Sequence, residues 1–164
     1  MHRRVILMRH ATASNAPHHH SDLDRPLTSS GIDDAREMVQ QLQHHGWVPT
    51  IAHHSHARRT TQTAAAFADL HVPRRAYQSL YLRGLPAIVD LAQTWPSHEA
   101  GPILLVGHNP GWAEAASALA CQSIMLSPGD AVLISTDAVT WTAAFQSRWH
   151  LHAILRPTNS RAMA

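Results

Sequence analysis

Two short aliphatic runs, at residues 4–8 and 103–106, constrain the fold of this chain most strongly. Neither run alternates apolar with polar residues, which indicates strands that are buried on both faces. Segments with the apolar spacing of amphipathic helices lie between these runs and further strand candidates. This alternation predicts an α/β fold: a three-layer α/β/α sandwich in which helices cover both faces of a mostly parallel sheet of about five or six strands.

The same patterns predict the other elements. Thr28 has the side chain of a helix N-cap, and apolar residues at helical spacing continue to the stop signals His45 and Gly46. The polar residues 15–25 indicate a loop. Further helices are predicted at residues 59–70, 86–95 and 112–120, further strands at residues 48–53, 76–80, 131–135 and 150–155, and residues 139–145 fit either structure.

Length and composition bound the domain organisation and the compartment. A chain of 164 residues with 45% apolar composition can bury one core, so we expect a single domain over residues 1–164. The N-terminal apolar run, residues 5–8, is too short for a signal peptide or a membrane span. We therefore expect a cytoplasmic protein without membrane contact. Because Cys121 is the only cysteine, an internal disulfide is excluded.

The charge pattern argues against nucleic acid as a partner. All 13 basic residues are arginines, scattered along a chain with a net charge of +2 and an aromatic content of 5%. A nucleic-acid binder normally shows a clustered basic face. Arginine is also the better bidentate ligand of phosphate groups, so this composition is compatible with smaller anionic ligands.

Polar side chains follow three of the predicted strands. Arg9 and His10 come directly after the first strand, residues 53–59 follow the second, and His108 follows the strand at residues 103–106. Ligands in such folds bind beyond the carboxyl ends of the strands, so we expect these side chains to meet. Taken singly, the Arg-His pair fits a solvated strand end and the Gly-His-Asn-Pro-Gly segment fits a turn before a helix. Their joint occurrence favours an anion site.

A pocket of arginines and histidines suits a phosphoryl group. Fixed guanidinium and imidazole donors stabilise the charge that spreads over the phosphoryl oxygens during transfer. A histidine nitrogen in line with phosphorus can also attack it and form a phosphohistidine, which water then hydrolyses. The strand ends therefore indicate phosphoryl transfer through a covalent intermediate.

Four motifs resemble, in order and spacing, those of the histidine phosphatase superfamily, whose characteristic motif is Arg-His-Gly. They are RHA at 9–11, DLDRPLTSSG at 22–31, SHARRTTQTA at 55–64 and LLVGHNPG at 104–111. The Arg-Pro-Leu-Thr segment is most similar to that of the short SixA-type phosphohistidine phosphatases. The resemblance extends from residue 4 to about residue 120. It implies a phosphoglycerate mutase-like fold and a mechanism without metal or cofactor.

The resemblance also implies catalytic roles for four residues. His10 matches the nucleophile that becomes phosphorylated, and Arg9 matches the adjacent phosphate ligand. Arg59 matches the arginine of the third motif. His108 matches the second phosphate-binding histidine of the family.

Two further residues are expected to bind substrate. Arg25, the arginine of the Arg-Pro-Leu-Thr segment, is expected at the mouth of the site. The alternative is that Arg25 only pairs with Asp22 or Asp24 within its loop. Asn109, which follows His108, is the second expected substrate ligand.

Departures from the family pattern bear on the substrate. Ala11 stands where the family usually has glycine, which matters only if the backbone there needs a positive φ. Larger members carry a glutamate or aspartate general acid after the third strand, whereas residues 80–84, LYLRG, offer none. Glu114 is the remaining candidate acid, with a solvated helix position as its alternative.

The lack of a general acid in residues 80–84 bears on the chemical nature of the leaving group. An alcohol leaves phosphate poorly unless it is protonated, whereas phosphohistidine with its other ring nitrogen protonated releases neutral imidazole. We therefore predict hydrolysis of the P–N bond of phosphohistidine on a protein such as a histidine-containing phosphotransfer domain. The short segments between the motifs leave little chain for a lid, which agrees with a protein substrate. The alternatives are a phosphomonoesterase for a small phosphorylated substrate and, in a different class, a catalytically weak phosphoprotein-binding module.

Two histidine-rich segments raise the question of a metal site. The first is the tract at residues 18–20, and the second contains His53, His54 and His56. Adjacent histidines rarely direct all their rings at one ion, and no carboxylate or cysteine pattern completes a ligand set. We expect solvated loop histidines and no bound metal.

Overall fold

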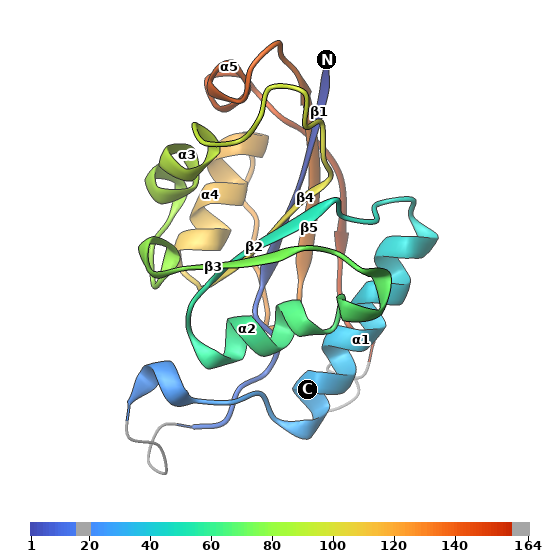
Figure 1. Ribbon diagram of the computed structural model, residues 1–164, viewed down its shortest axis with the longest axis vertical. Coiled ribbons are helices and arrows are strands. Elements are labelled where there is room, and N and C mark those ends of the chain that lie inside the picture. Colours follow the sequence, from blue (N-terminus) through green and yellow to red (C-terminus); the bar gives the residue numbers. More distant parts are fainter. Residues whose placement is uncertain (16–20, 159–164) are drawn as a thin grey trace.

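The computed structural model describes residues 1–15 and 21–158, and within them a six-stranded sheet is flanked by helices (Figure 1). The strands stand in the order β3-β2-β4-β1-β5-β6, and β5 runs in the direction opposite to that of the other five strands. The strands are β1 (His2–Arg9), β2 (Ile51–Ser55), β3 (Arg74–Tyr77), β4 (Ile103–Gly107), β5 (Ala131–Asp137) and β6 (His150–Leu155). The helices are α1 (Ser29–His44), α2 (Arg58–Ala65), α3 (Leu85–Ala92), α4 (Gly111–Ala120) and α5 (Trp141–Phe145), with 3-10 turns η2 (Asp22–Asp24), η3 (Ala68–Leu70) and η4 (Gln78–Leu80).

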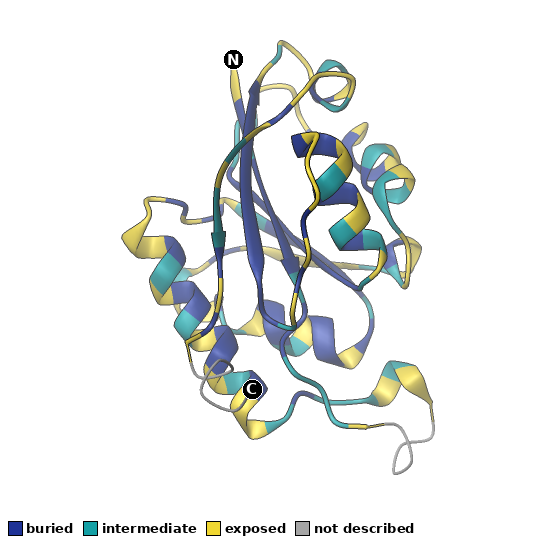
Figure 2. Cartoon of the chain, turned by 180° about the vertical axis from the view of Figure 1, so that it is seen from behind, coloured by how far each residue is buried: buried dark blue, intermediate teal, exposed yellow. Residues whose placement is uncertain are grey.

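Helices cover both faces of the sheet, which confirms the predicted three-layer fold (Figure 1). Alternate residues of β1 point to opposite cores, as the period of two in a strand requires. Val5 and Leu7 belong to the core that contains α3 and α4, whereas Ile6 and Met8 belong to the core that contains α1 and α2. These four β1 residues are fully buried, so both faces of the strand are apolar because each packs against a core. Figure 2 shows the buried strands between helices that expose one side to solvent.

Several predicted boundaries are wrong, and backbone pairing explains those of the second and third strands. The second strand begins at Ile51 rather than at residue 48, because Val48 is exposed, Pro49 has no N–H group, and pairing with β4 starts at Ile51. The third strand is β3 (Arg74–Tyr77), and residues 78–80 form a 3-10 turn. Its exposed arginines gave no apolar signal, because β3 is an edge strand held by its ladder with β2. The second helix, α2, ends at Ala65 instead of residue 70, and α3 ends at Ala92 instead of residue 95.

The register between β1 and β4 positions the end of both strands. Arg9 lies opposite Gly107 in the parallel ladder, and the N–H group of His10 donates to the carbonyl of Gly107 at 3.0 Å. His10 and His108 therefore leave the sheet side by side, at its carboxyl edge. β2 lies on the other side of β4, so the chain that leads into α2 arrives at the same edge.

In the part of the chain that the structure describes, no helix is both long and apolar enough to cross a bilayer.

Candidate active site

A cavity of about 380 Å³ lies where β1, β4 and the first turn of α2 meet. Its lining includes all the residues that the sequence predicted for the site, together with others that it did not. The lining residues are Arg9, His10, Thr12, Ala13, Asp22, Arg25, Arg59, Tyr81, Leu82, His108, Asn109 and Pro128.

His10 is buried at this cavity with one ring nitrogen fixed by the backbone. Its Nδ1 lies 2.8 Å from the carbonyl oxygen of Ala11, which can only accept, so Nδ1 carries the proton. The lone pair is therefore on Nε2, which accepts a hydrogen bond of 3.3 Å from Nε of Arg59. Burial, with further contributions from the cations of Arg59 and Arg9, lowers the pKa of His10 to about 4 despite the opposing effect of the Ala11 hydrogen bond. The imidazole is neutral at pH 7 and can act as a nucleophile.

The Arg59 guanidinium is the centre of the site. It projects from the first turn of α2 and is 1% exposed. Besides its bond to His10, it reaches Nδ1 of His108 at 3.2 Å, and it donates to both the carbonyl and the carboxylate of Asp22, at 2.7 and 3.0 Å. Thr63 ties the backbone of this turn to the strand end, because its hydroxyl donates to the Arg59 carbonyl and accepts from the N–H group of Ala11.

Two buried donors, on residues that line the cavity, have no hydrogen-bond partner among the described residues. Since Nδ1 of His108 accepts from Arg59, its Nε2 carries the proton, and this buried N–H group is unpaired. The same is true of Nε of Arg9, whose Nη1 donates to the carbonyl of Leu126 at 2.9 Å. Burial and the Arg59 cation lower the pKa of His108 to about 3, so its ring is neutral as well. Buried unpaired donors beside cations are suited to the oxygens of an anion.

The two predicted substrate ligands, Arg25 and Asn109, both line the cavity and both have internal partners. Nε of Arg25 donates to Oδ1 of Asp22 at 2.9 Å, so the pairing considered as an alternative occurs together with a position in the site. The amide of Asn109 donates to the carbonyl of Leu126 at 2.8 Å, the same acceptor that Arg9 uses. Arg9 and Asn109 are thus anchored to one backbone group.

Sequence reasoning missed Asp22 and Tyr81 as site residues. The Asp22 carboxylate accepts from Arg25, Arg59 and the hydroxyl of Tyr81. Although partial burial raises its pKa, these hydrogen bonds prevail and lower the pKa of Asp22 to about 2. Tyr81 comes from residues 80–84, the segment without a carboxylate, and its ring lies edge-on to His108 at 5.4 Å. The available signal was the position of Asp22 at the start of the motif that contains Arg25.

The structure also shows the surroundings of Ala11, which departs from the family pattern, and of Glu114, the remaining candidate acid. Ala11 is fully buried and is not among the residues with a positive φ, so alanine is accommodated without strain. Glu114 is exposed on α4 and does not line the cavity. Glu114 therefore corresponds to the solvated alternative rather than to a general acid.

No group of three or more histidine, cysteine, aspartate or glutamate side chains is arranged to hold a metal within residues 1–15 and 21–158. His53 is instead buried in β2, with its ring stacked on Trp95 at 5.3 Å between ring centres. The histidine tract at residues 18–20 lies outside the described residues.

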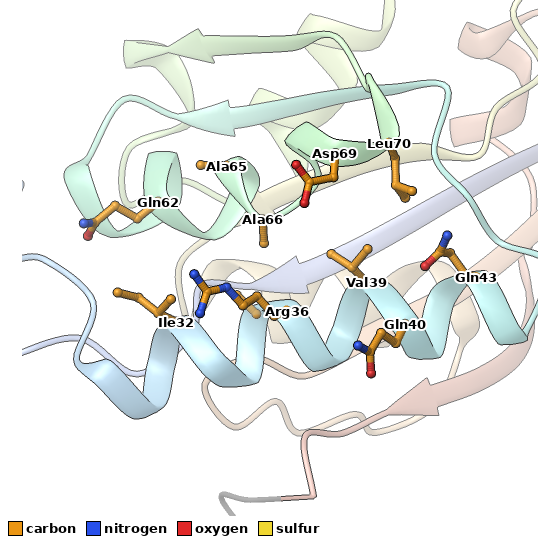
Figure 3. A pocket seen from close by; sticks show the side chains of 11 residues that line it. Ile32, Arg36, Val39, Gln40, Gln43, Gln62, Ala65, Ala66, Asp69 and Leu70 are labelled. Carbon is orange, nitrogen blue, oxygen red and sulfur yellow. The ribbon is translucent and has the colours of Figure 1, made fainter.

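A larger groove, of about 590 Å³, lies between α1 and α2 (Figure 3). Aliphatic and amide side chains line it, with Arg36 and Asp69 as its charged groups and no histidine or cysteine among its lining residues. One of its lining residues, Gln62, accepts from the N–H group of Leu27 at 2.8 Å and so braces the segment that follows Arg25. The reactive groups are in the smaller cavity.

Comparisons with known proteins agree with this geometry. A sequence profile of the histidine phosphatase superfamily (branch 1) matches residues 5–80. An uncharacterised chloroplastic protein of Arabidopsis thaliana is 31% identical over 173 aligned residues, which cover 96% of this chain and 79% of that protein. An uncharacterised protein of a Picosynechococcus strain is 33% identical over 119 residues, or 71% of this chain and 72% of its own length.

Solved structures match over nearly the whole chain. The proposed phosphohistidine phosphatase SixA of Nakamurella multipartita has a TM-score of 0.85 at 27% identity, with 96% of this chain and 98% of that chain covered. A second proposed SixA, from Agrobacterium tumefaciens, has a TM-score of 0.79 at 23% identity, covers 94% and 98% of the two chains, and shares the fold. These matches confirm the expected phosphoglycerate mutase-like fold. The chain belongs to the histidine phosphatase superfamily and is of the SixA type.

Proposed function

We propose that this protein hydrolyses phosphohistidine on another protein, through a covalent intermediate on His10. The observation that carries the proposal is the unprotonated Nε2 of His10 at a cavity that is also lined by Arg9 and His108, each of which has a buried, unpaired N–H group. A nucleophile and donors for phosphoryl oxygens are thus held together before substrate arrives. Preorganised donors of this kind are the main source of catalysis in phosphoryl transfer.

The first step transfers the phosphoryl group to His10. Arg9, Arg59 and the Nε2–H group of His108 bind the phosphoryl oxygens, with Arg25 and Asn109 at the edge of the cavity. Because a charged phosphoryl oxygen is a stronger acceptor than a neutral imidazole, it attracts the Arg59 guanidinium and frees the His10 lone pair. Nε2 then bonds to phosphorus while the bond to the leaving group breaks. The hydrogen bond from Nδ1 to Ala11 keeps the ring in the tautomer that attack requires.

The second step returns the enzyme to its initial state. Water bonds to phosphorus, the bond from phosphorus to Nε2 breaks with its electron pair going to His10, and one water proton passes to the released phosphate or to solvent. Every residue invoked is an arginine, a histidine or an amide of this chain. The mechanism uses no metal and no cofactor.

The absence of a protonated acid among the cavity residues supports phosphohistidine as the substrate. The carboxylate at the site, Asp22, has a pKa lowered to about 2 and is ionised. Burial, together with the hydrogen bond to Asp22, raises the pKa of the Tyr81 hydroxyl. Neither group suits the protonation of an alkoxide near pH 7. Release of neutral imidazole needs no such acid.

The mouth of the cavity supports a protein as the carrier of the phosphohistidine. Leu82 lines the cavity and is 56% exposed, and Asp22 is also exposed. These exposed side chains leave the described part of the mouth accessible to a histidine side chain on a partner surface, such as that of a histidine-containing phosphotransfer domain. We further propose that residues 1–164 act as one catalytic domain in the cytoplasm, without nucleic acid or membrane as a partner.

A small phosphomonoesterase is the second candidate. A mycobacterial glucosyl-3-phosphoglycerate phosphatase has the same fold, with a TM-score of 0.68 at 17% identity, so the fold alone fits either substrate. The two candidates differ in the leaving group, and the ionised Asp22 favours the nitrogen leaving group.

A direct comparison of substrates tests the proposal. Values of kcat/KM are measured for a phosphotransfer domain phosphorylated on histidine, for an aryl phosphate and for a sugar phosphate. We expect the phosphohistidine protein to be hydrolysed fastest. Faster turnover of the sugar phosphate would overturn the assignment of substrate, and binding of the phosphoprotein without any turnover would identify a binding module.

A further inference from the structure

We infer that Asp22 selects the leaving group: its carboxylate accepts a hydrogen bond from the ring nitrogen of the substrate phosphohistidine that does not carry phosphorus. This inference rests on the proposed function and deepens it. The preference of the enzyme for P–N over P–O bonds then results from the Asp22 carboxylate as well as from the lack of a general acid.

The position of Asp22 relative to His10 supports this role. His10 lies at the floor of the cavity with 8% of its surface exposed, whereas Asp22 lies at the mouth with 43% of its side chain exposed. Arg59 spans the distance between them, with Nε on His10 and Nη2 on Asp22. In-line displacement puts the leaving group on the side of phosphorus opposite the attacking nitrogen. An attack from the floor therefore directs the leaving ring toward the mouth, where Asp22 is.

The carboxylate is held firmly and still has room for another donor. Arg25, Arg59 and Tyr81 hold it from three different segments of the chain. Oδ2 accepts from Arg59 and Tyr81, whereas among the described residues Oδ1 accepts only from Arg25. A carboxylate has about four acceptor sites, so Oδ1 can accept one more hydrogen bond.

An ionised carboxylate at this place assists one class of leaving group and opposes the other. As Nε2 of His10 bonds to phosphorus, the P–N electron pair goes to the leaving nitrogen, and the proton on the other ring nitrogen stays there, shared with Asp22. Neutral imidazole departs. With a phosphate ester, negative charge develops on the leaving oxygen beside Asp22 and the two repel.

The charged surroundings of Asp22 keep it an acceptor. Arg25 beside η2 and Arg59 of α2 bind it directly, and Tyr81 donates from the segment after η4. His108, also on the cavity, has its pKa lowered and is neutral. The substrate ring is then the acidic partner, and a nearby carboxylate raises the pKa of that ring N–H group.

The test compares Asp22→Asn with Asp24→Asn. Asp24 is the matched control, because it is an exposed aspartate of the same 3-10 turn, accepts from Ser21 at 2.8 Å, and does not line the cavity. The substrates are a phosphotransfer domain phosphorylated on histidine and p-nitrophenyl phosphate. We expect Asp22→Asn to lower kcat/KM for the phosphohistidine protein by about tenfold or more, because a hydrogen bond to a charged group is lost. For p-nitrophenyl phosphate we expect kcat/KM to rise, because a negative charge leaves the cavity.

The dependence of the rate on pH distinguishes this role of Asp22 from one in which Asp22 only positions Arg59. The rate with phosphohistidine falls as pH rises through the pKa of the bound substrate ring. In Asp22→Asn this fall is expected about one pH unit lower. Equal losses on both substrates with an unchanged profile would overturn the inference, as would an unchanged ratio of the two kcat/KM values. A wild-type protein that hydrolyses p-nitrophenyl phosphate but not phosphohistidine would instead overturn the proposed function.

Discussion

Nε of Arg59 donates a hydrogen bond of 3.3 Å to Nε2 of His10, a residue 49 positions earlier in the chain. The pair joins the first turn of α2 to the end of β1, and it places a permanent cation against the nitrogen that we propose as the nucleophile. The contact favours the unprotonated ring and marks the place where a phosphoryl oxygen would bind. Removal of either side chain should therefore change both the charge in the cavity and the position of the other side chain.

Removing the Arg59 side chain should have a far larger effect than removing that of its neighbour. For Arg59→Ala we expect kcat/KM to fall by about 10²–10³-fold, the size of effect seen when one preorganised donor is lost. Arg58→Ala is the matched control, since Arg58 is exposed on the same helix, does not line the cavity, and should change kcat/KM by no more than about twofold. Steady-state kinetics on the phosphohistidine protein measure both. Similar losses in the two variants would contradict the assigned role of Arg59.

The buried histidines should make the protein unstable in acid. Burial lowers the pKa of His10 and His53 to about 4 and that of His108 to about 3, whereas the unfolded chain has a value of about 6.5. The unfolded state therefore binds more protons, so the free energy of unfolding is highest above pH 6.5 and falls as pH decreases through the folded-state values. Urea unfolding at a series of pH values measures this slope. His53→Asn should flatten it, and an equal slope in variant and wild type would exclude His53 as a contributor.

A side chain at position 107, where the protein has glycine, should destabilise the fold. A Cβ atom there would lie 2.4 Å from the indole of Trp112, whose Nε1 is fixed to the carbonyl of Leu105 at 3.1 Å. For Gly107→Ala we expect a loss of about 1–3 kcal/mol in the free energy of unfolding, as for other overpacked cores. Gly84→Ala serves as the control, because its Cβ would approach no described atom closer than 3.4 Å. Thermal or urea unfolding that ranks the two variants equally would contradict this account of β4.

Glu114 should be dispensable for catalysis. It lies in the first turn of α4, close in sequence to His108, but it is exposed and absent from the lining of the cavity. We expect Glu114→Gln to keep kcat/KM within about twofold on both phosphohistidine and aryl phosphate substrates. A selective loss on the aryl phosphate would show that Glu114 acts as the missing acid.

Much of the fold and of the candidate site could be predicted from the sequence, for physical reasons. Fully apolar strands such as β1 and β4 are recognisable because both of their faces are buried, and residues at the ends of parallel strands must meet. The edge strand β3 was misplaced because its pairing depends on backbone hydrogen bonds that leave no apolar pattern. Asp22 was missed for a similar reason. Its role depends on three donors from distant segments, which no spacing rule connects.

The covalent intermediate on His10 can be trapped by rapid quenching of the enzyme during turnover of a phosphotransfer domain that carries radioactive phosphate on histidine. The quench is alkaline, because the bond between phosphorus and a histidine nitrogen is labile to acid. We expect label to be transferred to His10 of the wild-type chain, and none to be found on His10→Ala. Turnover of the labelled protein by the wild type without label on His10, or the same labelling of His10→Ala, would contradict the covalent mechanism.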